Sequence, residues 1–259
     1  QLEGSRSEAD VVLGLDTNLM TAARDTGLFA THDIPAEGLT LPIAWDDAEF
    51  LPFDWGYFAF VHNADLPNPP QSFEELAASD LRILIQDPRS STPGLGLVYW
   101  IEAAYGDGAA QIWQDLADNI VTVTPGWSEA YGLFLEGEAD MVLSYTTSPA
   151  YHLIAEEDPS KSAAAFDEGH YMQIEIAGIT AASDQPDLAR AFMTFMLSPE
   201  FQSVIPTTNW MYPAALPVSA LPDGFETLIA PEKVLHFSGD EAAALRDAAI
   251  DRWQSALSR

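Results

Sequence analysis

The feature that most constrains the fold is the alternation of short apolar strands with helices between residues 81 and 144. Strands are predicted over 81–85, 120–123 and 140–144, and helices over 98–101, 109–117 and 128–136. This alternation is typical of βαβ units built around a mainly parallel sheet. The sequence therefore predicts an α/β protein.

Other segments extend this pattern toward both ends of the chain. Residues 11–15 form an apolar run that predicts a strand buried on both faces and ending at Asp16, followed by a helix over 18–30. Further strands are predicted over 57–61 and 171–179, and further helices over 73–78, capped by Ser72 with Glu75, over 186–197 and over 240–257. The last of these helices places Ala243, Leu245, Ala249, Ile250 and Trp253 close to one face.

The length of 259 residues allows one large domain or two lobes, because single cores stop growing at about 250 to 300 residues. We expect two lobes. The first is predicted over 1–60 with a return segment over 176–215, and the second over 61–175. Residues 216–259 are predicted to be a linker and a helix that packs on a lobe.

The charge of the chain excludes several functions. There are 40 Asp and Glu residues against 10 Lys and Arg, which gives a formal net charge of −30. Such a field repels phosphate backbones and anionic lipids, so nucleic-acid and membrane-surface roles are disfavoured. The acidic residues are spread along the chain, which indicates either a solvated surface suited to a saline habitat or the steering of a cationic solute.

The chain lacks cysteine, and no apolar run reaches the roughly 20 residues that span a bilayer. It does not open with a charged segment followed by an apolar one, so we expect no signal peptide within this chain.

The turn over 90–94, with the sequence SSTPG, precedes a predicted helix. Its hydroxyls and backbone N–H groups suit a phosphate or a carboxylate, because the start of a helix carries the positive end of the helix dipole. The alternative is an ordinary capped turn, which needs the same residue types.

Aromatic side chains cluster at three predicted loops or element ends, over 126–131, 144–151 and 209–213. Flat apolar rings stack on aromatic ligands and on cations. The cluster over 144–151 follows a predicted strand, where ligands of parallel sheets bind. Packing in the core is the alternative for each ring.

Signatures of enzymes are weak. The five histidines are scattered, so a metal site is not expected and surface or capping positions are predicted for each. There is no HExxH, GxSxG or Walker-type motif. A pair of carboxylates for glycoside hydrolysis stays open, because the chain has many acidic residues.

Long runs of the sequence carry a specific resemblance. They are ADVVLGLD (9–16), QDPRSSTPGLGL (86–97), GWSEAYGLF (126–134), LSYTTSPAYH (143–152) and NWMYP (209–213). With these runs the chain resembles the periplasmic thiamine-binding proteins of ABC importers, collinearly from its first residue to its last.

The resemblance implies a two-lobed periplasmic-binding-protein fold of the type II kind, with a hinge between lobes that close around thiamine, thiamine phosphate or thiamine diphosphate. It implies that Ser91 meets the phosphate or hydroxyethyl end of the ligand, with Trp127 beside it. Tyr145, Tyr151 and Trp210 would line the ring-binding part, and Asp16 would face the cleft. No catalysis, cofactor or metal is implied.

The resemblance also implies a monomer in the periplasm that delivers its ligand to a membrane permease. Members of the family begin with a further strand, helix and strand, so we expect the first lobe to be incomplete in this chain. Three alternatives stay open: a binding protein for another small anion or ferric iron on the same scaffold, a carboxylate-based hydrolase, and a sensor module that pairs with a receptor.

Overall fold

The computed structural model describes residues 7–258, which divide into two compact units. Unit 1 comprises residues up to 55, 173–222 and 238–243, and unit 2 comprises 56–172, 223–237 and 244 onward. Residues 1–6 and 259 of the predicted lobe ranges lie outside the described residues. The chain passes between the units within the strands β3 (Phe50–Asn63) and β8 (His170–Thr180), after residues 222 and 237, and within α10 (Gly239–Leu257).

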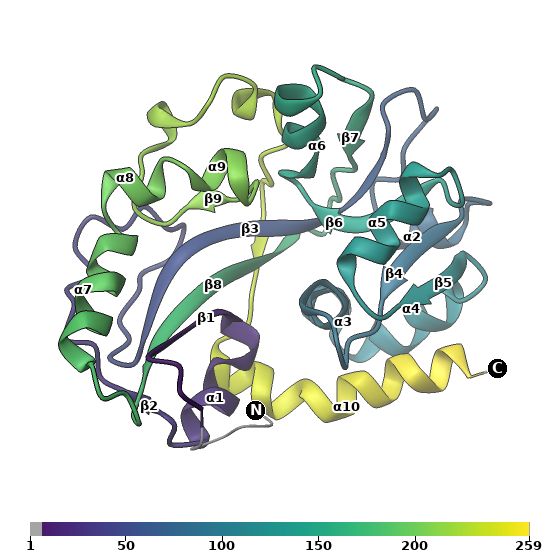
Figure 1. Cartoon of the computed structure of the whole chain (residues 1–259). Coiled ribbons are helices and arrows are strands. Elements are labelled where there is room, and N and C mark those ends of the chain that lie inside the picture. The colour runs from purple at the N-terminus through teal and green to yellow at the C-terminus, as the bar shows by residue number, and fades with distance from the viewer. Residues whose placement is uncertain (1–6, 259) are drawn as a thin grey trace. The chain divides into compact units, whose positions relative to one another are not determined.

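Unit 1 is built on an antiparallel arrangement around the later part of β8. Its other strands are β1 (Val11–Asp16), β2 (Phe29–Ala30), the first residues of β3, and β9 (Tyr212–Pro213). β1 and β2 pair with β8, and β9 pairs with β3 (Figure 1). The expectation that residues 11–15 are buried on both faces is wrong, because Leu13 is 52% exposed. Antiparallel strands commonly leave one face in water.

The helix predicted over 18–30 is shorter than expected. A 3-10 turn over Thr17–Leu19 leads into α1 (Met20–Asp25), and the chain then becomes β2. Gly27 adopts a positive φ of 63° just after α1. A glycine in this conformation ends a helix, since other residues tolerate it poorly.

The remaining helices of unit 1 follow β8. They are α7 (Pro186–Met196), α8 (Pro199–Gln202) and α9 (Ile205–Thr208), and a 3-10 turn covers Val218–Ala220. The helix predicted over 186–197 is therefore confirmed. The fully buried amide of Gln202 donates to the carbonyls of Phe53 and Met196, so α8 is fastened to β3 and to the end of α7.

Unit 2 confirms the predicted βαβ units. Strand β4 (Ile83–Gln86) pairs in parallel with β5 (Ile120–Thr124) and with β6 (Met141–Tyr145), as Figure 1 shows. The connecting helices are α3 (Thr92–Tyr105), α4 (Ala109–Leu116) and α5 (Trp127–Leu135). β3 joins this sheet antiparallel to β6.

Shorter elements complete unit 2. They are α2 (Phe73–Ala77), 3-10 turns over Gly106–Gly108 and Phe225–Thr227, α6 (Ser148–Ala150), a wide helical turn over Tyr151–Ala155, β7 (Lys161–Ala163) and β10 (Val234–Leu235). The predicted cap of α2 is confirmed, since the Ser72 hydroxyl accepts from the Glu75 backbone N–H at 3.0 Å.

The core of unit 2 is aromatic. The rings of Phe60, Phe73 and Phe166 pack against the buried Trp100 with centroid distances of 4.8 to 6.3 Å. The indole N–H of Trp100 donates to the Gly169 carbonyl at 2.8 Å. The polar atom of this large side chain is thus satisfied inside the core, as buried indoles require.

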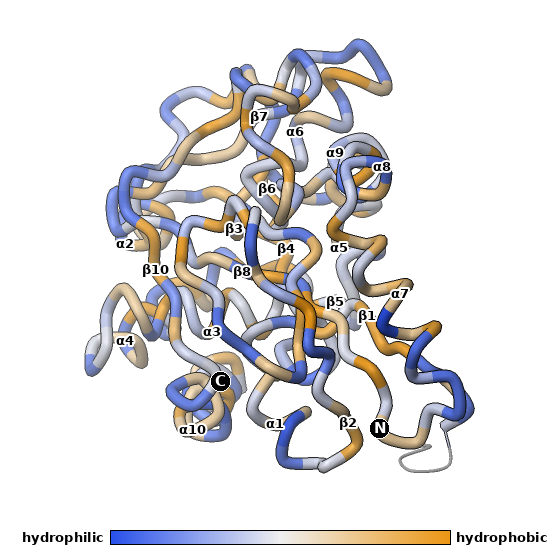
Figure 2. The backbone as a smooth tube through the Cα atoms, turned by 90° about the vertical axis from the view of Figure 1, so that its left-hand side faces the viewer, coloured by the Kyte–Doolittle hydropathy of each residue, from blue (hydrophilic) through white to orange (hydrophobic). Residues whose placement is uncertain are grey.

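Helix α10 (Gly239–Leu257) carries hydrophobic residues among hydrophilic ones (Figure 2). Ala249, Ile250 and Trp253 are buried as predicted, but Ala243 is exposed and Ala242 is buried in its place. The predicted face was therefore misplaced by one residue at its start. Among residues 7–258, no helix combines the length and the apolarity needed to cross a membrane.

Candidate functional site

The turn before α3 is held tightly against the end of β4. Ser91 precedes the helix in an extended conformation, and its side chain makes no capping hydrogen bond to the helix. A Cβ atom on Gly94 would lie 2.4 Å from the Gln86 carbonyl oxygen, so only glycine fits there. The backbone N–H groups at this helix start and the Ser91 hydroxyl together form a position suited to an anion.

Trp127 lies at the first residue of α5 and is 38% exposed. Its indole N–H donates to the Ser144 hydroxyl at 2.8 Å, and its ring stacks on Tyr131 with centroids 4.9 Å apart. The indole is thus fixed by a hydrogen bond and by stacking, while part of its surface stays in contact with solvent. Such a ring is ready to stack on a flat ligand.

Tyr131 connects Trp127 to His152. The Tyr131 hydroxyl lies 2.9 Å from His152 Nε2, and His152 Nδ1 lies 2.7 Å from a Glu156 carboxylate oxygen. Burial, followed by the charge of Glu156, raises the pKa of Tyr131 far above its ordinary value, so this hydroxyl stays protonated. This network fixes the orientation of the rings around Trp127.

The prediction that each histidine lies at the surface or in a cap fails for His62, His152 and His170, since all three are buried. His32 is buried too, but its Nδ1 atom accepts from the Ile34 N–H at 2.9 Å and caps a turn. The His170 ring lies 2.8 Å from the distant Phe58 carbonyl, whereas the His62 ring lies 2.8 Å from the carbonyl of its neighbour Asn63. Burial lowers the pKa of His170 to about 4. Sequence spacing gave no signal for these partners.

The two predicted tyrosines follow β6. Tyr145 ends this strand, with its ring centroid 5.1 Å from that of Phe58. Tyr151 is 38% exposed, and its ring stands edge-on to His152 with centroids 5.1 Å apart. A hydrogen bond to Glu156 raises the pKa of the Tyr151 hydroxyl.

Unit 2 therefore brings together four of the six predicted residues, Ser91, Trp127, Tyr145 and Tyr151. They lie near the carboxyl ends of β4, β5 and β6, which meet at one edge because these strands are parallel. The Ser90 hydroxyl donates to the Pro125 carbonyl at 2.7 Å, which links the turn before α3 to the start of α5. This edge of a parallel sheet is where ligands bind in such folds.

Trp210 belongs to unit 1 and has a strained backbone, with a φ of 57°. Its N–H donates to the Ile205 carbonyl at 3.1 Å, and the amide of the preceding Asn209 donates to Asp54 Oδ2 at 2.6 Å. Two residues later, the ring of Tyr212 stacks on Trp55 at 4.7 Å. A left-handed conformation for so bulky a residue is costly and is concentrated at functional sites.

The sixth predicted residue, Asp16, is 1% exposed, and its carboxylate accepts from the Asn18 N–H at 2.8 Å. It belongs to a row of acidic side chains in unit 1 that also includes Glu175 and Asp54. Sequence reasoning missed these two. The sequence does mark them, because Asp54 is the single acidic residue of the apolar run 51–60 and Glu175 is that of the run 171–179.

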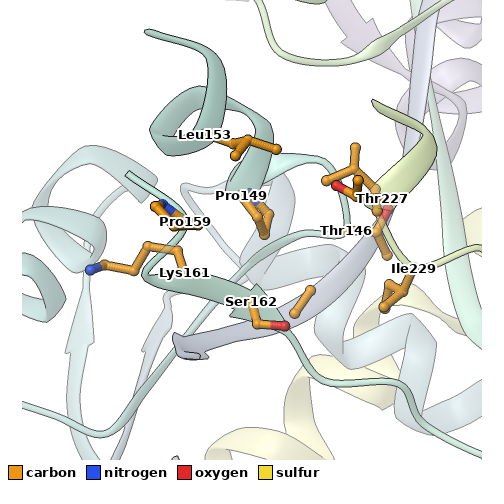
Figure 3. Close-up of a pocket in the computed structure, with 10 residues that line it drawn as sticks. Thr146, Pro149, Leu153, Pro159, Lys161, Ser162, Thr227 and Ile229 are labelled. Carbon is orange, nitrogen blue, oxygen red and sulfur yellow. The ribbon is translucent and has the colours of Figure 1, made fainter. Parts of the chain in front are cut away.

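A cavity of about 270 Å³ in unit 2 contains none of the six predicted residues (Figure 3). It is bordered by Thr146, Pro149, Leu153, Ser162 and Ile229, among others. Its lining is mostly apolar, and Thr146 is the neighbour of Tyr145. Within residues 7–258, no cluster of three or more His, Cys, Asp or Glu side chains is arranged to hold a metal ion.

Comparison with known proteins gives a consistent result. Residues 1–203 match the family described as bacterial extracellular solute-binding protein. The thiamine-binding periplasmic protein of Escherichia coli is 56% identical over 262 residues, covering all of this chain and 80% of that protein. The protein of the same description from Brucella melitensis is 49% identical, covering all of this chain and 78% of that protein.

Solved structures show the same likeness. A structure described as a periplasmic thiamin binding protein has a TM-score of 0.96 at 56% identity, covering all of this chain and 81% of that one. A ferric binding protein from Campylobacter jejuni has a TM-score of 0.80 at 20% identity, covering 98% and 85% of the two chains, which shows a shared fold alone. The predicted α/β periplasmic-binding-protein fold is confirmed.

Proposed function

Because the chain belongs to the family of bacterial extracellular solute-binding proteins, we propose that it captures thiamine in the periplasm for import by an ABC transporter. The observation that carries the proposal is the 56% identity, over the whole chain, to a protein described as binding thiamine. Its relatives are solute-binding proteins, and the chain is likewise a binding protein and not an enzyme.

The ring-binding residues suit the chemistry of thiamine, which joins a flat aminopyrimidine to a cationic thiazolium. Trp127, Tyr145 and Tyr151 in unit 2 and Trp210 in unit 1 offer aromatic faces for stacking and for cation–π contact. Both Trp127 and Tyr151 keep more than a third of their surface exposed. The predicted lobes, 1–60 with 176–215 and 61–175, are also part of this proposal.

Ser91 is assigned to the hydroxyethyl end of thiamine or to the phosphate of its esters. The support is a hydroxyl that does not cap its own helix, set at the start of the 14-residue α3. Delivery to a permease and a monomeric state complete the proposal. Calorimetric titration of the complete protein with thiamine tests it, and a folded protein that shows no binding would overturn it.

Trp210→Ala is expected to weaken thiamine binding by at least about 1 kcal/mol, because a stacking surface is lost. Trp210→Phe, which keeps an aromatic ring, should retain most of the affinity. Isothermal calorimetry on both variants measures the difference. Unchanged affinity in the alanine variant would remove Trp210 from the proposed site.

Ser91→Ala is expected to weaken the binding of thiamine phosphate more than that of thiamine, by about 1 kcal/mol, because a hydrogen-bond donor to a charged group is lost. Competition titrations with both ligands measure the two losses. Ser203→Ala, a change at an exposed serine of unit 1, serves as the control. Equal losses for the two ligands would contradict a phosphate role.

A further inference from the structure

We propose that the row of carboxylates Asp16, Glu175 and Asp54 is the counter-charge by which unit 1 selects a cationic ligand, and that the row releases a proton when the cation binds. This inference rests on the proposed function, since thiamine supplies the cation.

The row follows from the strand arrangement. Asp16 and Glu175 are direct partners in the antiparallel ladder of β1 and β8. β3, which carries Asp54, is the neighbour of β8 on its other side in the strand order. Asp16 and Asp54 are 1% and 0% exposed, and Glu175 is partly buried. Three acidic groups thus lie across three adjacent strands with little access to water.

Among the residues that the structure describes, neither Asp54 nor Glu175 takes part in an ion pair with lysine or arginine. Amides contact the two acids instead: the Gln173 amide donates to Glu175 at 3.3 Å, and the Asn209 amide donates to Asp54. Burying charges without a partner is costly, so the arrangement favours an incoming positive charge.

Two buried polar atoms support a role in binding. Gln173 is 1% exposed, and its Oε1 atom has no hydrogen-bond partner, although its Nε2 atom lies against Glu175. Asp54 Oδ1 is likewise buried without a hydrogen-bond partner. Nearly all buried polar atoms in folded proteins are satisfied, so two such acceptors in one cluster point to a further hydrogen-bond donor.

The aromatic neighbours indicate what kind of cation fits. Trp55 follows Asp54 in β3 and stacks on Tyr212, and Asn209, which holds Asp54, precedes Trp210. Aromatic faces beside negative charge are the usual way to recognise a ring cation or a quaternary nitrogen. A hydrated metal ion would need more carboxylate or carbonyl ligands in direct contact.

The carboxyl groups of the row hold protons near neutral pH, and a bound cation would displace one of them. Burial, followed by the charge of Asp16, raises the pKa of Glu175 to about 7. Burial and then the charge of Glu175 raise the pKa of Asp54 well above its ordinary value. Near neutral pH the row therefore keeps protons that carboxyl groups normally lose. A cation bound nearby favours the charged form and lowers these pKa values, which releases a proton.

The test is calorimetry of the intact protein with thiamine at pH 6, 7 and 8, in buffers of different ionisation enthalpy. We expect release of a few tenths of a proton per thiamine at pH 7, and an affinity that rises severalfold from pH 6 to pH 8. Binding of thiamine without proton release, at an affinity that does not change with pH, would overturn this inference and leave the proposed function intact. Absence of binding would overturn both.

Glu175→Gln provides the matched variant. It should abolish most of the proton release and reduce the preference for thiamine over thiochrome, its uncharged oxidised form, by about tenfold. Glu200→Gln, a change at an exposed acid of unit 1, should leave both quantities unchanged. Undiminished proton release and preference in Glu175→Gln would remove the row from ligand selection. If that variant does not fold, the number of protons that the unaltered protein releases per thiamine bound tests the inference by itself.

Discussion

Replacing Arg252 by methionine is expected to lower the free energy of unfolding by about 3 kcal/mol. The guanidinium of Arg252 makes two hydrogen bonds of 2.7 Å to the carboxylate of Glu102, which is only 6% exposed in α3. Methionine keeps the apolar stem but removes the charge, so Glu102 is left buried without its partner. Urea denaturation at pH 7, followed by circular dichroism, measures the loss.

The double variant Glu102→Gln with Arg252→Met provides the control for this prediction. It removes both charges, and it should recover a substantial part of the lost stability because no buried charge remains. A loss below about 1 kcal/mol in the single variant would mean that Glu102 finds another partner or reaches water. The ion pair would then contribute as little as an exposed one.

Glu175→Gln is expected to stabilise the protein at pH 8 by about 3 kcal/mol and to have almost no effect at pH 4. The pKa of Glu175 is about 7 in the folded protein, against an ordinary value of 4.5. Between these two values the folded state holds a proton that the unfolded chain has released, so stability falls as the pH rises. Glutamine removes this dependence, because it carries no charge at any pH.

Denaturation curves at pH 4, 5, 6, 7 and 8 measure this effect. The free energies of Glu175→Gln and of the unaltered protein should diverge between about pH 4.5 and pH 7 and differ by a constant amount at higher pH. Glu200→Gln should follow the unaltered protein throughout. Parallel curves for Glu175→Gln and the unaltered protein would show that Glu175 titrates as an ordinary carboxyl group.

The fold of unit 2 could be predicted from the sequence because its signals are local. Each strand from 83 to 145 is a short apolar run, and each helix between them begins at a turn of small or capping residues. Unit 1 was predicted less well. The positive φ of Gly27 ended a helix that composition alone would have continued, and the exposure of Leu13 depends on strand pairing that no local pattern reveals.

For the candidate site too, local features could be predicted from the sequence and distant contacts could not. Ser91, Trp127, Tyr145 and Tyr151 lie at element ends, where strand and helix boundaries already indicated them. Contacts between residues far apart in the sequence could not be predicted from it. Each of Asp54 and Glu175 stands out as the single acid of an apolar run, but sequence spacing does not show that the two lie together. The bond between Tyr131 and His152 is equally hidden, because the partners come from different helical segments.

The division of unit 1 into separate stretches of chain affects how the protein is made. β1 pairs with residues 175–179 of β8, which a ribosome synthesises only after all of residues 56–172. Until then the early residues have no partner strand, and the unit cannot close. Pairings so distant in sequence slow folding. The emerging polypeptide therefore holds residues 11–16 without their partner strand until residues 175–179 have been made.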